Sequence, residues 1–154
     1  MLSEKVKIVN MGPPVDVNGS GLDGDYVSLK NYRWATIVIQ LGVTGAAGKI
    51  TVEEAKAVDG TGAQAMGFNY RAEETAEGDT LEALTATSAA NGISTSTNDN
   101  IFYVIEISAD ELSEGYDCIR VRMTDPAAAT LVSMCAVLSQ ARYSQENMPS
   151  AITD

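Results

Sequence analysis

The chain has 154 residues and a formal net charge of −11, from 21 acidic and 10 basic residues, and it contains no histidine. Nucleic-acid binding depends on neutralising phosphates with Lys and Arg, so this charge excludes a nucleic-acid-binding protein. The lack of histidine removes Ser-His-Asp and Cys-His catalysis as usually built, together with the commonest metal ligand. The length predicts one domain, and no apolar run approaches the roughly 20 residues of a membrane helix, so we expect no membrane association.

The beginning of the chain differs in composition from the rest. A short extended segment reaches Pro13 and Pro14, which we expect to end any hydrogen-bonded ladder because proline lacks a backbone N–H. Residues 16–25 are dense in Gly, Asp and Asn, which is typical of a loop. We therefore expect an arm outside the core before the folded domain begins. The predicted boundaries are an N-terminal arm at 1–25, a β-domain at 26–143 and a C-terminal tail at 144–154.

Short apolar, β-branched runs follow one another along the domain. Residues 34–43 are apolar on both faces, which is typical of a strand in the middle of a structure. Residues 130–140 permit either helix or strand, and their β-branched side chains favour strand. About eight short, evenly spaced strands predict an all-β, two-sheet sandwich that is jelly-roll-like. The predicted strands lie at 27–29, 34–43, 50–58, 65–71, 101–107, 118–123 and 130–140, with an ambiguous segment at 79–87 and a surface connection or weak edge strand at 88–100.

Two local features accompany these strands. Ser108 and Glu111 stand at the spacing of a capping box, which predicts one helical turn after the strand at 101–107. Cys118 and Cys135 both lie inside apolar strand runs without further cysteine or histidine partners. We expect them to be buried free thiols, since free cysteine behaves as a small hydrophobe, with a disulfide between neighbouring strands as the alternative.

Candidate chemistry is sparse. The acidic residues stand beside one another in polar stretches, and nothing singles out a shielded carboxylate pair for acid–base catalysis, so we expect no enzyme and no cofactor. The first half of a calcium loop is present before Gly21, but its twelfth position is Val27 and not a bidentate Glu. A self-capping Asx turn is the favoured interpretation of this loop. The weak calcium candidates are Asp16, Asn18, Ser20 and Asp23.

The aromatic residues allow a further alternative. Tyr26, Tyr32 and Trp34 are close in sequence, and alternation places Tyr32 and Trp34 on one face of a strand. They favour packing at the edge of the core, while a sugar-stacking platform is the alternative. The arginines are too scattered for a nucleic-acid patch but can act as isolated interface anchors. The predicted partner-binding residues are Tyr32, Trp34, Arg142, Tyr143 and Pro149.

Three sequence patterns resemble a known family. They are LKNY..ATIVI..G at residues 29–42, ISADEL...YD at residues 107–117, and ARY followed by a proline-containing tail. Together they resemble head decoration or cement proteins, which are small proteins found beside the major capsid protein in tailed phages and prophages. The resemblance covers roughly residues 27–154 and rests on framework positions, so no functional residues carry over with it.

The resemblance implies a structural role. It implies a non-enzymatic virion protein that is made in the bacterial cytoplasm, binds the major capsid protein and cements the capsid exterior. Many weak contacts multiplied by symmetry would then give strong attachment, and both chain ends could order on neighbouring subunits. We expect a homotrimer, with a dimer next. A tail or neck component and a carbohydrate-binding module on the virion exterior are the alternatives.

Overall fold

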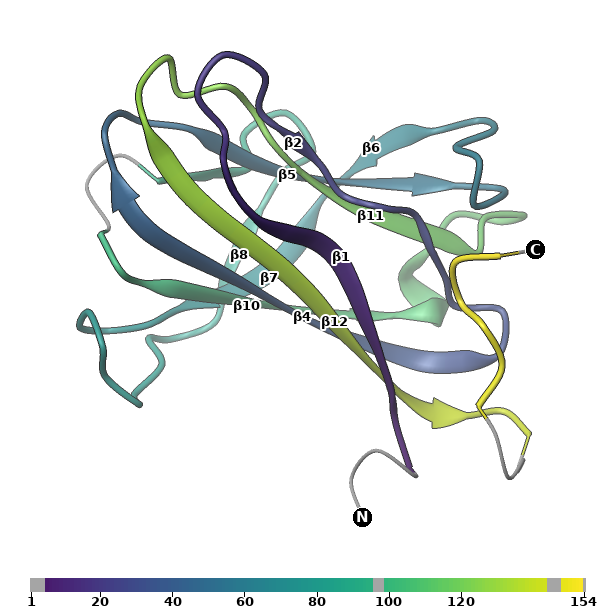
Figure 1. Ribbon diagram of the computed structural model, residues 1–154. Helices are drawn as coiled ribbons and strands as arrows, with labels where there is room; N and C mark the ends of the chain where they lie inside the picture. The colour runs from purple at the N-terminus through teal and green to yellow at the C-terminus, as the bar shows by residue number, and fades with distance from the viewer. Residues whose placement is uncertain (1–4, 96–98, 144–147, 154) are drawn as a thin grey trace.

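The computed structural model of the protein describes residues 5–95, 99–143 and 148–153. They form an all-β sandwich of two antiparallel six-stranded sheets (Figure 1), and this part of the chain contains no α-helix. The predicted fold class is confirmed. The strands are β1 (Lys7–Asp16), β2 (Leu22–Asp23), β3 (Val27–Ser28), β4 (Tyr32–Thr44), β5 (Lys49–Ala55), β6 (Gln64–Met66), β7 (Phe68–Ala72), β8 (Thr85–Thr87), β9 (Ile93–Ser94), β10 (Phe102–Ser108), β11 (Cys118–Met123) and β12 (Thr130–Ala141).

The first sheet is built around β4. Its strand order is β1-β12-β4-β10-β7-β8, and β4 pairs with β12 on one side and β10 on the other. Ala35, Ile37 and Ile39 alternate inward along β4 and are fully buried, as the strand period of two residues requires. Since β12 is a strand over its whole length, the choice between helix and strand for residues 130–140 is settled in favour of strand.

The second sheet covers the inner face of the first. Its order is β2-β11-β5-β6, with β3 also paired to β11 and β9 to β5. Ile119, Val121 and Met123 point inward from β11 and are buried against the first sheet. Arg120 and Arg122 point outward from the same strand. The core is therefore the layer between the two sheets.

The strand predicted at residues 65–71 is divided between the two sheets. The chain leaves β6 in the second sheet, turns at Gly67, and enters β7 in the first sheet. A Cβ at Gly67 would lie 3.0 Å from the carbonyl oxygen of Thr87, so the close backbone approach favours glycine here. The prediction of one continuous strand is wrong because alternation alone does not show where a strand changes sheets.

The N-terminal segment is part of the sandwich, which corrects the expected arm for residues 7–25. β1 pairs with β12 from Lys7 to Asp16, and the core includes Met11 and Val17. The ladder shifts register around Pro13 and Pro14 and then resumes, so the expectation that these prolines end it is wrong. β1 is an edge strand, where irregular pairing accommodates residues that lack a backbone N–H.

The described part of the C-terminal tail also contacts the domain. Ala151 is buried in the core, and its carbonyl oxygen accepts a 2.7 Å hydrogen bond from the backbone N–H of Ser28. The hydroxyl of Tyr32 donates a 2.8 Å hydrogen bond to the carbonyl oxygen of Pro149. Residues 149–151 are therefore hydrogen-bonded to both sheets and do not extend away from the domain. The rest of the predicted tail, residues 144–147 and 154, lies outside the described residues.

The remaining fold predictions concern the capped turn, the two weak segments and the number of strands. The capping box at Ser108 and Glu111 is confirmed, and it closes a single 3-10 turn at Ala109–Glu111. In the segments at 79–87 and 88–100, the described residues form the short strands β8 and β9, and Ile93 of β9 is buried. The count of about eight strands is too low, because the described residues form twelve, several of them only two or three residues long. No helix in the described ranges is long and apolar enough to span a membrane.

Candidate functional site: the apolar face of the first sheet

The outer face of the first sheet is apolar over β1, β12, β4 and β10. Because Ile37 and Ile39 point into the core, alternation turns Thr36, Val38 and Gln40 outward. The neighbouring strands follow the same alternation, and we call their combined outward surface the apolar face. Its residues are Ile8, Asn10, Trp34, Thr36, Val38, Gln40, Phe102, Val104, Glu106, Leu131, Ser133, Cys135, Val137 and Ser139.

The antiparallel register aligns these side chains into rows across the sheet. In one row, Cys135 lies between Asn10 on β1 and Val38 on β4, and Val38 is followed by Val104 on β10. Glu106 is the one charged side chain among the residues that define the apolar face. Two further charged residues stand at its margins, since Asp16 on β1 lies opposite Leu131 and Arg71 on β7 lies opposite Val104.

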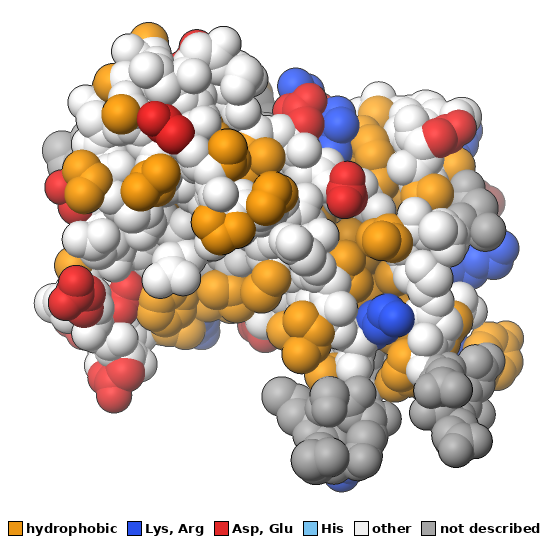
Figure 2. Space-filling view, in the orientation of Figure 1, with side chains coloured by type: hydrophobic (Ala, Val, Ile, Leu, Met, Phe, Trp, Pro, Cys, Tyr) orange, Lys and Arg blue, Asp and Glu red, His pale blue; other side chains and the backbone are white. Residues whose placement is uncertain are grey.

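Two large side chains stand out from the apolar face. Ile8 is 57% exposed and Leu131 is 53% exposed. Figure 2 shows hydrophobic side chains gathered over the region of β1, β12 and β4. Contiguous exposed apolar surface is uncommon on monomeric soluble proteins and marks sites of protein–protein contact. The apolar face is therefore the candidate binding surface of the protein.

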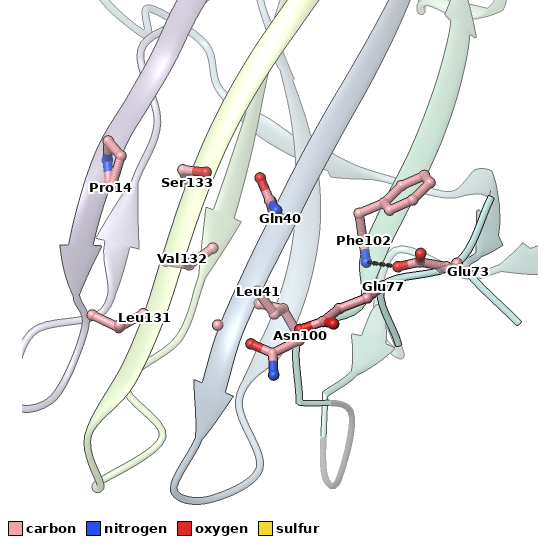
Figure 3. A pocket seen from close by; sticks show the side chains of 12 residues that line it. Pro14, Gln40, Leu41, Glu73, Glu77, Asn100, Phe102, Leu131, Val132 and Ser133 are labelled. Carbon is pink, nitrogen blue, oxygen red and sulfur yellow. Dashed lines mark hydrogen bonds between the residues drawn. The ribbon is translucent and has the colours of Figure 1, made fainter. Parts of the chain in front are cut away.

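An open groove of about 580 Å³ lies at one end of the apolar face. As Figure 3 shows, Pro14 and Leu131 line one side, while Phe102, Asn100 and Glu73 line the other. Glu73 is only 3% exposed, and one carboxylate oxygen, Oε2, accepts a 3.1 Å hydrogen bond from the backbone N–H of Phe102. The groove thus combines apolar walls with a buried carboxylate.

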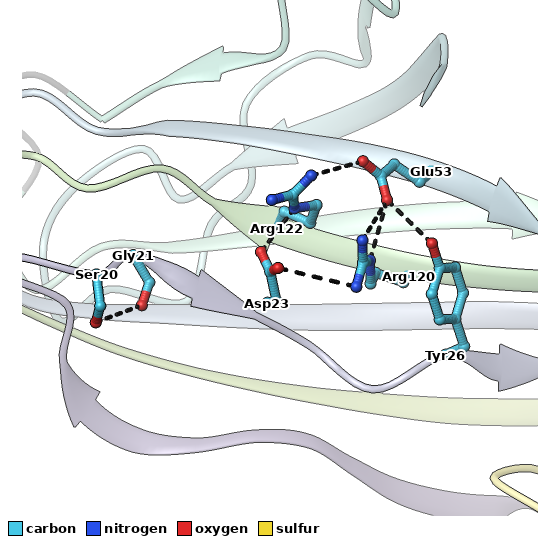
Figure 4. A network of polar contacts seen from close by, with 7 residues as sticks. All are labelled: Ser20, Gly21, Asp23, Tyr26, Glu53, Arg120 and Arg122. Atoms are coloured by element: carbon cyan, nitrogen blue, oxygen red, sulfur yellow. Dashed lines mark hydrogen bonds and ion pairs between the residues drawn. The ribbon is translucent and has the colours of Figure 1, made fainter. Parts of the chain in front are cut away.

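The outer face of the second sheet has a different character (Figure 4). Glu53 on β5 accepts hydrogen bonds from Arg120 Nη2 at 2.7 Å, Arg122 Nη1 at 2.9 Å and the Tyr26 hydroxyl at 3.1 Å. Arg122 Nε also donates to Asp23 Oδ1 at 2.6 Å. The Arg120 guanidinium lies 4.4 Å from the centre of the Tyr26 ring, a cation–π distance. We call these five residues the arginine network.

The arginine network shifts the pKa values of its members. Burial alone would raise the pKa of Glu53, but hydrogen bonds from Arg122 and Arg120 outweigh it and lower the pKa. Burial raises the pKa of Tyr26, and its hydrogen bond to Glu53 raises it further. Hydrogen bonds to Asp23 and Glu53 raise the pKa of Arg122. Each charge in the network is therefore compensated by a neighbour within the chain.

The candidate calcium ligands are engaged with different protein partners. Asp16 Oδ1 accepts 3.0 Å hydrogen bonds from the backbone N–H groups of Asn18 and Thr130, and these two bonds lower the pKa of Asp16. Ser20 Oγ donates to the carbonyl oxygen of Gly21, and Asp23 belongs to the arginine network. Within the described ranges, no three His, Cys, Asp or Glu side chains lie close enough together to hold a metal ion.

Tyr26 and Tyr32 are packed within the fold, as the favoured interpretation expects, and do not form the alternative sugar-stacking platform. Tyr32 is fully buried and Tyr26 is 7% exposed, so neither ring offers a free stacking surface. Trp34 is half-buried on the apolar face, where it lines a small depression of about 270 Å³. The expectation that Tyr32 contacts a partner is wrong, because its ring lies in the core.

The other predicted contact residues lie near the end of β12. Arg142 is exposed and lines a shallow depression of about 590 Å³, in which Arg33 Nη2 lies 3.2 Å from Asp110 Oδ2. Tyr143 is 66% exposed. Pro149 is half-buried and accepts the Tyr32 hydrogen bond. Their roles in binding stay predictions.

Cys118 and Cys135 are not joined by a disulfide, as expected. Cys118 is fully buried, which confirms its prediction. Cys135 is only half-buried, because it points outward onto the apolar face instead of into the core.

Comparison with known proteins adds little beyond the fold. No family model matches the chain, and no curated protein matches it. Among solved structures, the chain is similar to the SPBc2 prophage-derived protein YomS, with 10% sequence identity, a TM-score of 0.43, and coverage of 86% of this chain and 92% of that one. This is a loose likeness of overall shape, and no conclusion about function follows from it.

Proposed function

We propose that the protein is a non-enzymatic structural component of a tailed-phage virion, which decorates and stabilises the capsid by binding the outer surface of the shell. The apolar face carries this proposal. Ile8 and Leu131 are more than half exposed at 57% and 53%, and both lie on the apolar face, whose defining residues include one charged side chain, Glu106. Burying such a face against a shell removes apolar surface from water and desolvates few charges.

The distribution of charge is consistent with this role. The net charge of −11 keeps free copies apart in solution, while the apolar face provides one surface at which this repulsion is weak. On a capsid lattice, many copies of a modest contact act together, so a single interface does not need high affinity. The sandwich supplies a rigid platform, because both sheets share one continuous core.

The resemblance to decoration proteins concerns the same part of the fold. Residues 29–42, which carry its first pattern, include most of β4, and residues 107–117 include the capped turn after β10. The first pattern lies mainly in the first sheet and the second mainly in the turn and loop between β10 and β11, so both are framework positions that identify no contact. The major capsid protein is accordingly the proposed partner, the capsid exterior the proposed location, and a homotrimer the proposed assembly, with a dimer as the alternative.

Quantitative mass spectrometry of purified virions tests the proposal. Several hundred copies per particle are expected for a protein that decorates the shell. About six or twelve copies would instead indicate a neck or tail component with closed rotational symmetry. Absence from the particle, in a lysate where the protein is abundant, would overturn a virion role altogether.

A further inference from the structure

We infer that the groove at the end of the apolar face receives a lysine or arginine side chain from a basic segment of the partner protein. This inference rests on the proposed function and specifies the chemistry of the partner. Glu73 is only 3% exposed, yet it lines an open groove of about 580 Å³.

The carboxylate of Glu73 is only partly compensated within the chain. Its Oε2 accepts the hydrogen bond from the Phe102 N–H, a neutral donor, at 3.1 Å. In the described ranges, no lysine or arginine forms an ion pair with Glu73 or with Glu77, the second carboxylate of the groove. A neutral N–H donor compensates a buried negative charge less completely than a cation does. A cation from outside the chain would complete this compensation.

The walls of the groove specify the shape of that cation. Pro14, Leu131 and Phe102 provide apolar surface, while Gln40 and Asn100 provide amide groups. A long side chain with an apolar stem and a charged head matches this arrangement, since its stem packs on hydrophobic walls and its head reaches a carboxylate. Lysine and arginine are the side chains of this kind, which makes them better candidates than a small inorganic cation.

The position of the groove also favours a segment of a partner chain. The lining comes from β1, β12, β4 and β10, and from the segments after β7 and before β10 that carry Glu73, Glu77, Gly78 and Asn100, so the groove borders the apolar face. One protein surface can therefore cover the apolar face while a single basic side chain enters the groove. The two features together give an apolar contact with one directional ion pair, which fixes the orientation of the partner.

The first test uses small peptides and the full-length protein. The probe is acetyl-Leu-Arg-Leu-amide, and the matched control peptide carries norleucine in place of arginine. We expect the arginyl peptide to shift the backbone NMR signals of Gly42, Gly78, Asn100 and Phe102, and to bind at least tenfold more tightly than the control. Equal binding of both peptides, no binding at millimolar concentration, or shifts confined to other surfaces would overturn the inference.

Charge variants separate the groove from general electrostatics. Glu73→Gln keeps an oxygen that can accept from Phe102 while removing the charge, and we expect it to weaken the arginyl peptide about tenfold. Glu77→Gln removes an exposed carboxylate of the same groove, and we expect it to weaken binding of the arginyl peptide about threefold. Glu106→Gln removes one charge from the same sheet face outside the groove and should change the affinity less than twofold. If Glu106→Gln weakens binding as much as the groove variants do, the inference is wrong.

Binding to phage shells then distinguishes this inference from the proposed function. If the wild-type protein and both groove variants co-sediment with shells equally well, the groove inference fails while decoration stands. If the arginyl peptide binds as expected but no shell binding occurs, decoration fails while the groove stands. Peptide-free self-association that Glu73→Gln abolishes would identify a second copy of this chain as the occupant, and would also overturn the inference.

Discussion

The outer faces of the two sheets differ in polarity: the second sheet carries paired charges, whereas the first is largely apolar. On the second sheet, Glu53 and Asp23 neutralise Arg120 and Arg122, and the Tyr26 ring covers part of one guanidinium. On the first sheet, the residues that define the apolar face include one charged side chain, Glu106, and its Ile8 and Leu131 side chains are more than half exposed.

This difference separates surface that stabilises the fold from surface that is available to a partner. The arginine network satisfies its charges inside the chain, so a partner would gain little by contacting it and would have to compete with existing ion pairs. The apolar face has no such internal compensation. Its outward valines and isoleucine stay in contact with water until another surface covers them, and that is why we assign attachment to the first sheet.

The largest expected effect comes from placing a charge on the apolar face. Leu131→Glu introduces a carboxylate at a 53% exposed position, so folding should change by less than about 1 kcal/mol. Burying that carboxylate against a shell should weaken binding by about tenfold or more, because an unpaired charge is costly to desolvate. Co-sedimentation with shells over a concentration series measures the change.

The matched control places the same charge on the opposite face. Thr51→Glu lies on β5 of the second sheet, beside Arg122 in the register of β5 and β11. We expect wild-type shell binding for this variant. Equal losses for both variants would show that net charge, and not the apolar face, governs attachment.

The next effect concerns the arginine network and is one of stability. Glu53→Ala leaves Arg120 and Arg122 without their shared carboxylate, whose side chain is only 15% exposed. We expect the free energy of unfolding to fall by about 2–3 kcal/mol, measured by urea denaturation. Glu114→Ala, at an exposed position, should change it by less than about 0.5 kcal/mol. Shell binding at a temperature where both variants are folded should be unaffected.

The same network predicts that the stability of the fold depends on pH. Because the pKa of Glu53 is lowered below the ordinary value of 4.5, its contribution to stability is present above pH 4.5 and is lost as the pH falls through the lowered value. Glu53→Gln should therefore lose less stability than the wild type on acidification below pH 4.5. Parallel curves of unfolding free energy against pH for the two proteins would contradict this assignment.

The smallest expected effect concerns the C-terminal segment that contacts both sheets. Tyr32→Phe removes the hydrogen bond from the first sheet to Pro149, in a segment whose Ala151 also accepts from Ser28 of the second sheet. We expect a loss of about 1 kcal/mol in unfolding free energy. Tyr143→Phe, at a 66% exposed ring, is the control and should be neutral. Faster proteolysis near residue 148 in Tyr32→Phe alone would locate the effect in this segment.

The fold was predictable where the hydrophobic pattern is strong. The alternation in β10 and β11 and the two-faced apolar run of β4 located the main strands, and the capping box at Ser108 was correct in detail. The pattern fails in β1, where Pro13 and Pro14 suggested an end to pairing although an edge strand tolerates them. It also fails at Gly67, because a change of sheet leaves the alternation intact.

The candidate site was less predictable. The run at residues 37–39 carries the sequence signal for the apolar face. A strand that is apolar on both faces predicts burial of both faces within the chain, so the pattern alone does not indicate an exposed face. Whether Val38 faces a second layer or solvent depends on which elements cover the sheet, and that is a property of the tertiary structure. The arginine network was missed for a similar reason, since Asp23 and Arg122 are brought together from positions 99 residues apart.

Hydroxyl-radical footprinting of the protein bound to shells tests the assignment of the binding face most directly. Ile8, Leu131 and Trp34 report on the apolar face, and Tyr116, whose ring lies under Lys56 of the loop after β5, reports on the side of the second sheet. We expect oxidation of the first three to fall several-fold on shell binding while oxidation of Tyr116 is unchanged. Protection of Tyr116 with undiminished oxidation of Ile8 and Leu131 would contradict attachment through the first sheet.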